Sequence, residues 1–570
     1  MRGMRVPARR SGFLIFAVLC CSIFVTLGPA PRAQEPIPGP TASTLEHGGE
    51  PQNWLTFYGN YQGWSYSSLD QISRKNVKDL VPAWAFGAGN PPPALNMRGG
   101  LESTPIVMDG VLYLEGIQNN IYALDAATGN LIWKYDYPWP RAGLTVGAGG
   151  ARGIAIGDGR LYMGTRDNHL VAVNAHTGKE IWNISVEDNA KCHCGINAAP
   201  LFIRGKVVTG VSGVSKSRAY IRAFDASTGK LIWNFDVIPS PDQPGGDSWP
   251  ADTYKTGSGA TWFTGTYDPD LNMIFWGTGD PYPEDPSGRP GANLYTDSLL
   301  ALDADTGTLK WYHQEFPHDP YDFDSTMEPV LIEASIGGTK RKLIVHASKD
   351  GFVYVYDRAT GKVLNTFPFA TVTWTKGLDA DGNPLNQVDW KQEKSPMLCP
   401  GWGQGLAIDH PAYSPHTGWW YMTATEKCSW QNAPSDAASR VLNPKVPPHI
   451  AAFDPITGET QWSFNTVYYN QSSLLLTAGD LVFAGDVKGS AFALDAKTGQ
   501  QLWSFNTGSV ICSLPMTYSV NGRQYVAIAA GGGSIGENNV NLYYPGVDTQ
   551  TQIPPLSATL FVFALPANKK

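Results

Sequence analysis

The chain has little charge and no haem-attachment motif, and each scarcity excludes a class of function. Only 16% of its 570 residues are Asp, Glu, Lys or Arg, and the formal net charge is −8. No block of basic residues follows the N-terminal stretch, which argues against a surface that binds nucleic acid. No Cys-x-x-Cys-His motif occurs, so we expect no covalently attached c-type haem.

Long apolar runs are also missing after the first 33 residues. Four arginines precede the apolar run from Phe13 to Leu27, and small or turn-forming residues follow up to Ala33. This order is typical of a secretion signal, and the run is shorter than a bilayer span requires. We therefore expect residues 1–33 to be a signal peptide and the mature chain to be exported, with no transmembrane segment.

Cysteine is scarce, with five copies after that segment: Cys192, Cys194, Cys399, Cys428 and Cys512. In an oxidising compartment disulfides are the first expectation, and the odd number leaves a free or an intermolecular thiol. Cys192 and Cys194 flank a histidine and form a weak candidate for a metal site, because no second ligand pair supports them. The pairing of Cys192, Cys194 and Cys512 stays open.

One motif is abundant: an apolar run, Asp or Asn, a short spacer, Thr-Gly and usually Trp. Each copy predicts a β-hairpin with a tight turn, and serial repetition of such units indicates a β-propeller. The seven copies run over Asp125–Trp133, Asn174–Trp182, Asp225–Trp233, Asp303–Trp311, Asp357–Asn365, Asp454–Trp462 and Asp495–Trp503.

An eighth unit is divided between the two ends of the chain. Ala558–Pro566 supplies the first half of the motif, and Leu80–Phe86 supplies the second half with Trp84 in the tryptophan position. Pairing these strands would close the ring and remove exposed sheet edges. The prediction is an all-β fold: one eight-bladed propeller over residues 34–570, with its ring closed by pairing of the N- and C-terminal strands.

Several segments resemble the pyrroloquinoline quinone (PQQ)-dependent alcohol dehydrogenases, which are eight-bladed quinoproteins of the bacterial periplasm. The segments that carry the resemblance are Trp54–Ile72, Gly257–Pro281, Arg289–Gly307, Phe316–Asp324 and Tyr525–Gly532. The resemblance implies a periplasmic enzyme that oxidises a small alcohol to a carbonyl. It also implies that electrons leave to a separate acceptor such as a cytochrome c.

The resemblance assigns roles to particular residues. Trp262 corresponds to the aromatic floor on which PQQ stacks, and Asp322 to the base that takes the alcohol proton while hydride passes to the quinone. The alternatives are a tryptophan packed between blades and an acidic surface loop. The residues that correspond to polar cofactor contacts are Glu102, Arg152, Ser212 and Lys349.

The same resemblance implies a metal ion and a disulfide. Asp280, Asp322 and Asp324 are the expected ligands, and hard carboxylate oxygens suit Ca²⁺ or a lanthanide. An aspartate in the position of Asp324 is associated with lanthanide use in the family. Cys399 and Cys428 match a family disulfide that closes a loop of about 30 residues and stabilises by about 3–4 kcal/mol.

Other positions depart from the family pattern. The glutamate ligand is replaced by Val214 or Ser215, and the asparagine ligand by Asp280. The adjacent Cys-Cys pair that covers the cofactor is missing from Thr145–Gly153. An expected asparagine aligns near Ala407, and glycine replaces a tryptophan within residues 529–534.

These departures keep two alternatives open. One is a cofactor-free propeller that acts as a binding protein, and the other is a scaffold for outer-membrane assembly. A scaffold needs neither a buried base nor an aromatic floor, so Trp262 and the loop around Asp322 argue against it. Only a test for the cofactor separates the dehydrogenase from the cofactor-free propeller.

Overall fold

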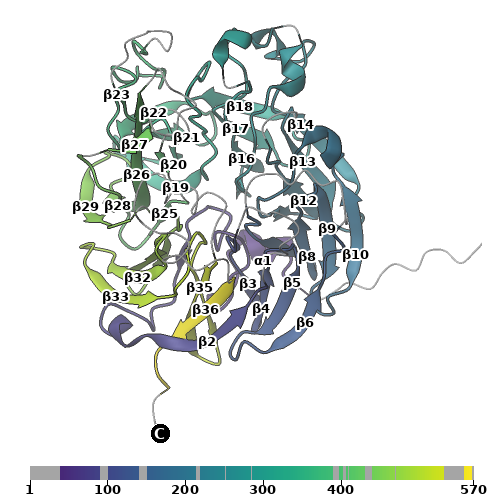
Figure 1. Ribbon diagram of the computed structural model, residues 1–570, viewed down its shortest axis with the longest axis vertical. Helices are drawn as coiled ribbons and strands as arrows, with labels where there is room; N and C mark the ends of the chain where they lie inside the picture. The colour runs from purple at the N-terminus through teal and green to yellow at the C-terminus, as the bar shows by residue number, and fades with distance from the viewer. Residues whose placement is uncertain are drawn as a thin grey trace, which may run out of the picture. The chain divides into compact units, whose positions relative to one another are not determined.

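The computed structural model describes residues 39–89, 100–139, 150–213, 218–250, 252–283, 285–388, 397–401, 406–407, 410–430, 440–443, 445–468, 470–531 and 558–567. The predicted signal peptide, residues 145–149 of the segment that lacks the Cys-Cys pair, Val214 and Ser215 lie outside these ranges. Within them the regular secondary structure is almost entirely β-strand (Figure 1).

The described strands form eight sheets, and five of these contain four antiparallel strands that follow one another in the chain. These five sheets are β3 (Ile106–Met108), β4 (Val111–Glu115), β5 (Ile121–Asp125) and β6 (Leu131–Tyr135); β7 (Ile154–Gly157), β8 (Arg160–Gly164), β9 (His169–Asn174) and β10 (Glu180–Ser185); β11 (Leu201–Ile203), β12 (Lys206–Thr209), β13 (Tyr220–Asp225) and β14 (Leu231–Asp236); β15 (Thr266–Asp268), β16 (Met273–Gly277), β17 (Ser298–Asp303) and β18 (Leu309–Gln314); and β19 (Val330–Ile336), β20 (Thr339–Ala347), β21 (Phe352–Asp357) and β22 (Val363–Pro368).

The other three sheets are less regular. One is built on the long strand β26, and two take up a strand from the N-terminal part of the chain. They comprise β23 (Met397–Leu398), β24 (Leu406–Ala407), β25 (Ala412–Tyr413), β26 (Trp420–Trp430), β27 (Arg440–Leu442), β28 (His449–Phe453) and β29 (Thr460–Asn465); β1 (Tyr66–Ser67) with β30 (Leu475–Thr477), β31 (Leu481–Gly485), β32 (Ser490–Asp495) and β33 (Gln501–Asn506); and β2 (Val81–Gly87) with β34 (Met516–Val520), β35 (Arg523–Ala530) and β36 (Thr559–Ala564).

The two half-motifs at the ends of the chain pair as the sequence predicts. β2 runs antiparallel to β36, with Trp84 opposite Val562 (Figure 1). In the complete copies the motif tryptophan has the same place on the fourth strand: Trp233 lies opposite Ala223 and Trp311 opposite Ala301. The divided unit therefore builds the same kind of sheet as the complete ones.

The motif tryptophans join successive sheets. The indole Nε1 of Trp233 donates a hydrogen bond to the Ala304 carbonyl of the next sheet at 3.2 Å. Trp233 also covers the turn glycine of that sheet, because a Cβ on Gly307 would lie 2.5 Å from its ring. Equivalent hydrogen bonds run from Trp84 to Ala126, Trp182 to Ala226, Trp311 to Arg358, Trp462 to Ala496 and Trp503 to Leu80.

The one copy without tryptophan divides this contact between two side chains. Asn365 stands in the tryptophan position, opposite Val355, and its Nδ2 donates to the Ile456 carbonyl at 2.6 Å. Phe367 covers the turn glycine, because a Cβ on Gly458 would lie 2.4 Å from its ring. Residues two apart on a strand share a face, so β22 presents both groups to the next sheet.

We call the contact between a motif side chain and the turn of the next sheet a seam. Adding a methyl group at one seam tests this contact. Gly307 has φ +69°, and Gly307→Ala would place Cβ against Trp233 in a strained backbone, so we expect a loss of about 2–4 kcal/mol. Gly508→Ala is the matched control, because Gly508 has φ +75° with nothing within 4 Å of the added Cβ. It should cost about 1 kcal/mol. The measurement is the urea midpoint of each variant, and equal losses would contradict the docking role.

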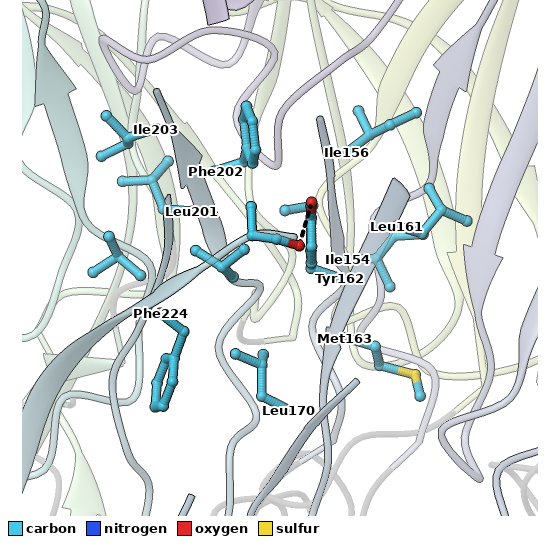
Figure 2. Packing of buried hydrophobic residues seen from close by; sticks show 14 of the residues in the cluster. Ile154, Ile156, Leu161, Tyr162, Met163, Leu170, Leu201, Phe202, Ile203 and Phe224 are labelled. Carbon is cyan, nitrogen blue, oxygen red and sulfur yellow. Dashed lines mark hydrogen bonds between the residues drawn. The ribbon is translucent and has the colours of Figure 1, made fainter. Parts of the chain in front are cut away.

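The core fills the space between neighbouring sheets. Figure 2 shows side chains of β7, β8 and β9 facing those of β11 and β13, among them Tyr162 and Phe202. Their rings stack with centroids 5.8 Å apart, and Gly157 leaves room for Phe202, which a Cβ there would meet at 2.4 Å. Alternating apolar residues on each strand therefore become contacts between sheets rather than within one sheet.

Helices are few and short in the described part of the chain, and none is long and apolar enough to cross a membrane. They are α1 (Ala42–Glu46), α2 (Asn189–Cys192) and the 3₁₀ turns η1 (Val77–Asp79), η3 (Gly246–Ser248), η4 (Thr253–Thr256) and η5 (Pro286–Gly288).

Two disulfides answer the cysteine question. Cys399 pairs with Cys428, which confirms the pairing implied by the resemblance, and Cys192 pairs with Cys194. Cys512 forms no disulfide with another described cysteine, and its Sγ lies 3.7 Å from Oε1 of Gln471. The metal interpretation of Cys192 and Cys194 is therefore wrong, because a disulfide sulfur is no thiolate ligand.

Candidate functional site

The residues singled out from the sequence lie in loops at the same end of several sheets. Arg152 and Trp262 precede the first strands β7 and β15, whereas Asp280 and Lys349 follow the second strands β16 and β20. In an antiparallel meander the start of the first strand and the end of the second strand lie at the same end of the sheet. Residues far apart in the sequence therefore meet at this end.

Trp262 is half-buried and is held in place by its neighbours in the chain. Thr261 anchors the segment: its N–H donates to the Val211 carbonyl at 2.9 Å, and its Oγ1 accepts from the Val211 N–H at 2.8 Å. Phe263 packs beside the indole with ring centroids 4.1 Å apart. The ring is therefore rigidly mounted and partly open, as a stacking surface requires.

Two cationic side chains approach this ring. The guanidinium carbon of Arg152 lies 5.0 Å from the Trp262 centroid, and Nζ of Lys349 lies 5.7 Å from it. Arg152 also pairs with Glu102 at 3.3 Å, and both side chains are 9% exposed. Its Nη1 is buried and has no hydrogen-bond partner among the described residues. A buried guanidinium N–H without an acceptor fits an anionic ligand above the ring.

Ser212 is connected to Arg152 through one short segment. Its N–H donates to the Gly195 carbonyl at 2.8 Å, and two residues later the Asn197 carbonyl accepts the Arg152 N–H at 3.0 Å. The Cys192–Cys194 disulfide lies next to this bridge, because a Cβ on Gly213 would lie 2.8 Å from Cα of Cys194. The predicted contact Ser212 therefore belongs to the same neighbourhood as Arg152 and Glu102.

The three predicted metal ligands form one cluster. Carboxylate oxygens of Asp280, Asp322 and Asp324 all lie within 4.8 Å of one another. The Asp280 N–H donates to Oδ1 of Asp324 at 2.9 Å, which joins the loop after β16 to the loop before β19. Burial, followed by repulsion from Asp322 and Asp324, raises the pKa of Asp280 well above its usual value. Such crowding of carboxylates favours a cation between them.

Lys349 supplies a positive charge to this cluster. Its Nζ lies 2.5 Å from Oδ2 of Asp324 and 3.5 Å from Oδ1 of Asp322. Burial acts to lower the pKa of Lys349, but Asp324 and Asp322 outweigh it, so the pKa stands above its ordinary value. The lysine is therefore an ammonium ion between the aromatic ring and the carboxylates.

The loop that carries Asp322 is shaped by a residue that the sequence did not single out. Both oxygens of the buried Asp319 accept backbone N–H groups, from Tyr321 at 2.6 Å and Phe323 at 2.7 Å. These hydrogen bonds fold the loop so that Asp322 adopts φ +65°, a left-handed conformation that aspartate tolerates better than most residues. The spacing of Asp319 from Tyr321 was the available signal, because aspartate often bonds N–H groups two residues on.

His410 and Glu328 form a buried pair, which the sequence also did not single out, next to Phe263, the neighbour of Trp262. His410 Nδ1 lies 2.7 Å from Oε2 of the fully buried Glu328, and its ring packs edge-on against Phe263 at 4.4 Å. Burial, with a smaller effect of Arg152, lowers the pKa of His410 well below its usual value. No sequence motif pointed to this histidine, because its partner lies 82 residues away.

A buried glutamate next to the site gives the protein a pH-dependent stability. Burial raises the pKa of Glu115 from 4.5 to about 8, against the lowering effects of Asn119 and Arg166. The unfolded chain releases this proton near pH 4.5 and the folded chain only near pH 8, so the contribution of Glu115 to stability falls between these values.

Glu115→Gln is expected to remove this dependence, because the amide carries no titrating proton and keeps an oxygen for the Asn119 Nδ2 donor at 2.7 Å. The measurement is the free energy of unfolding from pH 4.5 to 8 in urea. Glu459→Gln, an exposed substitution, is the control and should leave the slope unchanged. An unaltered slope in Glu115→Gln would contradict the assignment.

Comparison with known proteins identifies the family of the chain. A family model described as the PQQ "Glucose/ethanol/alcohol dehydrogenase, beta-propeller domain" matches residues 54–373 and 468–526. Quinoprotein alcohol dehydrogenase PedH of Pseudomonas putida is 33% identical to this chain, and the alignment covers 92% of each of the two chains. The lanthanide-dependent methanol dehydrogenase of Methylorubrum extorquens is 32% identical over 83% of this chain and 86% of its own.

Solved structures give the same result. The quinohemoprotein alcohol dehydrogenase ADHIIG of Pseudomonas putida HK5 matches with a TM-score of 0.81 and 31% identity, over 94% of this chain and 84% of that one. A europium-containing methanol dehydrogenase matches with a TM-score of 0.78 and 27% identity, over 92% and 100%. The chain therefore belongs to the PQQ-dependent alcohol dehydrogenases, a family of β-propeller oxidoreductases.

Proposed function

We propose that the protein is a periplasmic PQQ-dependent dehydrogenase that oxidises a small alcohol to a carbonyl and passes the electrons to a separate acceptor such as a cytochrome c. One observation carries the proposal. A half-buried indole, Trp262, has Arg152 and Lys349 within 6 Å of its ring, and Lys349 connects it to three clustered carboxylates. This combination suits a planar anion beside a hard cation.

The chain's residues fit the cofactor. PQQ is a flat tricarboxylate, so it needs an aromatic floor and cationic partners. Trp262 offers the floor, and the buried Nη1 of Arg152, which has no partner in the described part of the chain, offers a donor for a carboxylate. Glu102 orients Arg152 through their ion pair, and Ser212 is proposed as a further polar contact.

The residues also fit a metal ion. Asp280, Asp322 and Asp324 offer hard oxygen donors from two loops, and high negative charge suits a trivalent ion as well as Ca²⁺. We propose a lanthanide as the preferred ion because Asp324 adds a third carboxylate. Two relatives are named for lanthanide or europium content, which supports this choice.

When bound, PQQ would supply the acceptor for hydride and the cation would supply Lewis acidity. The remaining roles belong to residues of the chain. Asp322, which is 27% exposed, accepts the proton of the substrate hydroxyl as general base. Arg152 and Lys349 hold negative charge against the Trp262 face, and Asp319 keeps the backbone of Asp322 in place.

The remaining expectations about organisation are part of the proposal. Residues 1–33 are the signal peptide, and residues 34–570 form one propeller in which each of the eight sheets is a blade. The antiparallel pairing of β2 with β36, together with the Trp503 and Trp84 hydrogen bonds on either side, supports closure of the ring. Residues Ile37–Lys570 form one compact unit, which supports a single domain.

The test is binding of PQQ to the purified mature protein, measured by calorimetry with CaCl₂, with LaCl₃ and with EDTA. We expect tight binding that requires a metal, tighter with LaCl₃, followed by dye-linked oxidation of an alcohol. Absence of binding under every condition would refute the proposal and leave a cofactor-free binding propeller. Binding that EDTA leaves unchanged would refute the metal part alone.

A further inference from the structure

We propose that Lys349 is a built-in counter-ion of the carboxylate cluster, which blocks the cluster to metal ions until the cofactor draws the lysine away. The inference rests on the proposed function, because the group that releases the lysine is the quinone. It assigns to Lys349 a positioning role that couples two binding events.

The first step is that Lys349 and a metal ion compete for the same oxygens. Nζ of Lys349 lies 2.5 Å from Oδ2 of Asp324 and 3.5 Å from Oδ1 of Asp322. The other oxygen of Asp324, Oδ1, already accepts the Asp280 N–H at 2.9 Å. Both oxygens of Asp324 therefore have donors, and a metal ion that binds Asp324 must share an oxygen either with the Asp280 N–H or with the positively charged Lys349.

The second step is that the competition takes place in a buried site. The side chains of Lys349 and Asp324 are 9% and 7% exposed. An ammonium and a metal ion that share one carboxylate there repel each other with little screening by solvent. Lys349 and the metal ion are therefore expected to exclude each other from Asp324.

The third step is that Lys349 has a second place to go. Its ammonium lies 5.7 Å from the Trp262 ring centroid, so it already borders the surface on which the cofactor is proposed to stack. Its backbone N–H bonds the Asp324 carbonyl at 3.3 Å, so the four-carbon side chain can change partners while the backbone stays in place. The oxygen atoms of a quinone on that ring would offer the alternative acceptors.

The consequence is a coupling between cofactor and metal. If the cofactor removes Lys349 from Asp324, it raises the affinity for the metal, and by linkage the metal raises the affinity for the cofactor by the same factor. Couplings of this kind are typically about 5–150-fold. Direct bridging by the ion would also couple the two, so the test must isolate the lysine.

The test measures LaCl₃ and CaCl₂ binding to the cofactor-free mature protein by calorimetry, and TbCl₃ binding by luminescence. Lys349→Met removes the charge at similar length, and Lys349→Gln keeps a donor toward Asp324. We expect at least about tenfold tighter La³⁺ binding in the charge-free variants. Lys342→Met is the matched control. Lys342 lies on strand β20, outside the cluster, and pairs with Asp270 at 2.5 Å and with Asp268 at 3.8 Å. It should bind La³⁺ as the unaltered protein does.

The same titrations are repeated with PQQ present, where the gain from the substitutions should shrink. The proposal is overturned if neither charge-free variant binds La³⁺ more tightly without cofactor, or if Lys342→Met gains as much. Failure of the proposed function gives a different result: the unaltered protein would not bind PQQ, whatever the metal affinity of the variants. Thermal unfolding with and without LaCl₃ supplies a second readout, and the variants should gain more stability from the ion than the unaltered protein.

Discussion

Asp322→Asn is expected to lower kcat by about 10²–10⁴-fold, the usual contribution of a positioned general base. Asparagine keeps the size of the side chain and tolerates the φ of +65° that residue 322 adopts, so the fold of the loop should survive. The amide cannot take the hydroxyl proton. The measurement is dye-linked alcohol oxidation at saturating PQQ and LaCl₃, with binding of both checked separately because Asp322 is also a proposed ligand.

The control for this substitution is Asp109→Asn. Asp109 also has a positive φ, of +49°, but it is exposed at the hairpin between β3 and β4, where its N–H bonds Asn53. This variant should keep full activity and so show that the chemistry, rather than an aspartate in left-handed backbone, is affected. A kcat within a few-fold of the unaltered enzyme for Asp322→Asn would remove Asp322 as the base.

Trp262→Ala is expected to weaken PQQ binding by about 10–100-fold. Stacking of a planar ring on an aromatic side chain is worth about 1–3 kcal/mol, and each 1.4 kcal/mol corresponds to about tenfold in affinity. Arg152 and Lys349 would also lose the ring that lies about 5–6 Å from their charges. The measurement is calorimetric titration with PQQ, since removing a tryptophan alters the fluorescence itself.

Trp430→Ala is the matched control, because Trp430 is 51% exposed and is the last residue of β26. Its loss should leave PQQ affinity unchanged. Trp262→Phe keeps an aromatic surface and should lose less than Trp262→Ala. Equal PQQ affinity of Trp262→Ala and the unaltered protein would mean that the indole only packs against its neighbours and does not stack on the cofactor.

The repeats could be predicted from the sequence because their cause is local. The Asp-x-x-Thr-Gly turn closes on itself: Oδ1 of Asp225 accepts hydrogen bonds from the N–H groups of Ser227 and Thr228. Because these hydrogen bonds join residues of the turn itself, each copy of the motif predicts a hairpin. The pairing of β2 with β36 was predictable for the same reason, since Trp84 and Ala558–Pro566 are recognisable parts of one unit.

The site was predictable only where a motif from the family marked it. Trp262, Asp322 and Lys349 stand in such motifs, and the structure places them close together. Asp319 lies within Phe316–Asp324 but was given no role there, and His410 is outside the motifs. What they do depends on partners that folding supplies: two N–H groups of a turned loop, and a glutamate from a distant segment. The disulfide between Cys192 and Cys194 also needed the structure, since the odd number of cysteines allowed several pairings.

The seam formed by Asn365 and Phe367 has a consequence for how such proteins diverge. At the contact made by Trp233 one indole both donates a hydrogen bond to the next sheet and covers its turn glycine. At the seam of Asn365 and Phe367 an amide and a phenyl ring perform the two tasks separately. A single substitution of tryptophan need not open the structure there, provided that a ring two residues further on can take its place. Relatives that have lost the signature residue can thus preserve the interface, and matching pairs of side chains across a seam would be a better guide to kinship than tryptophan alone.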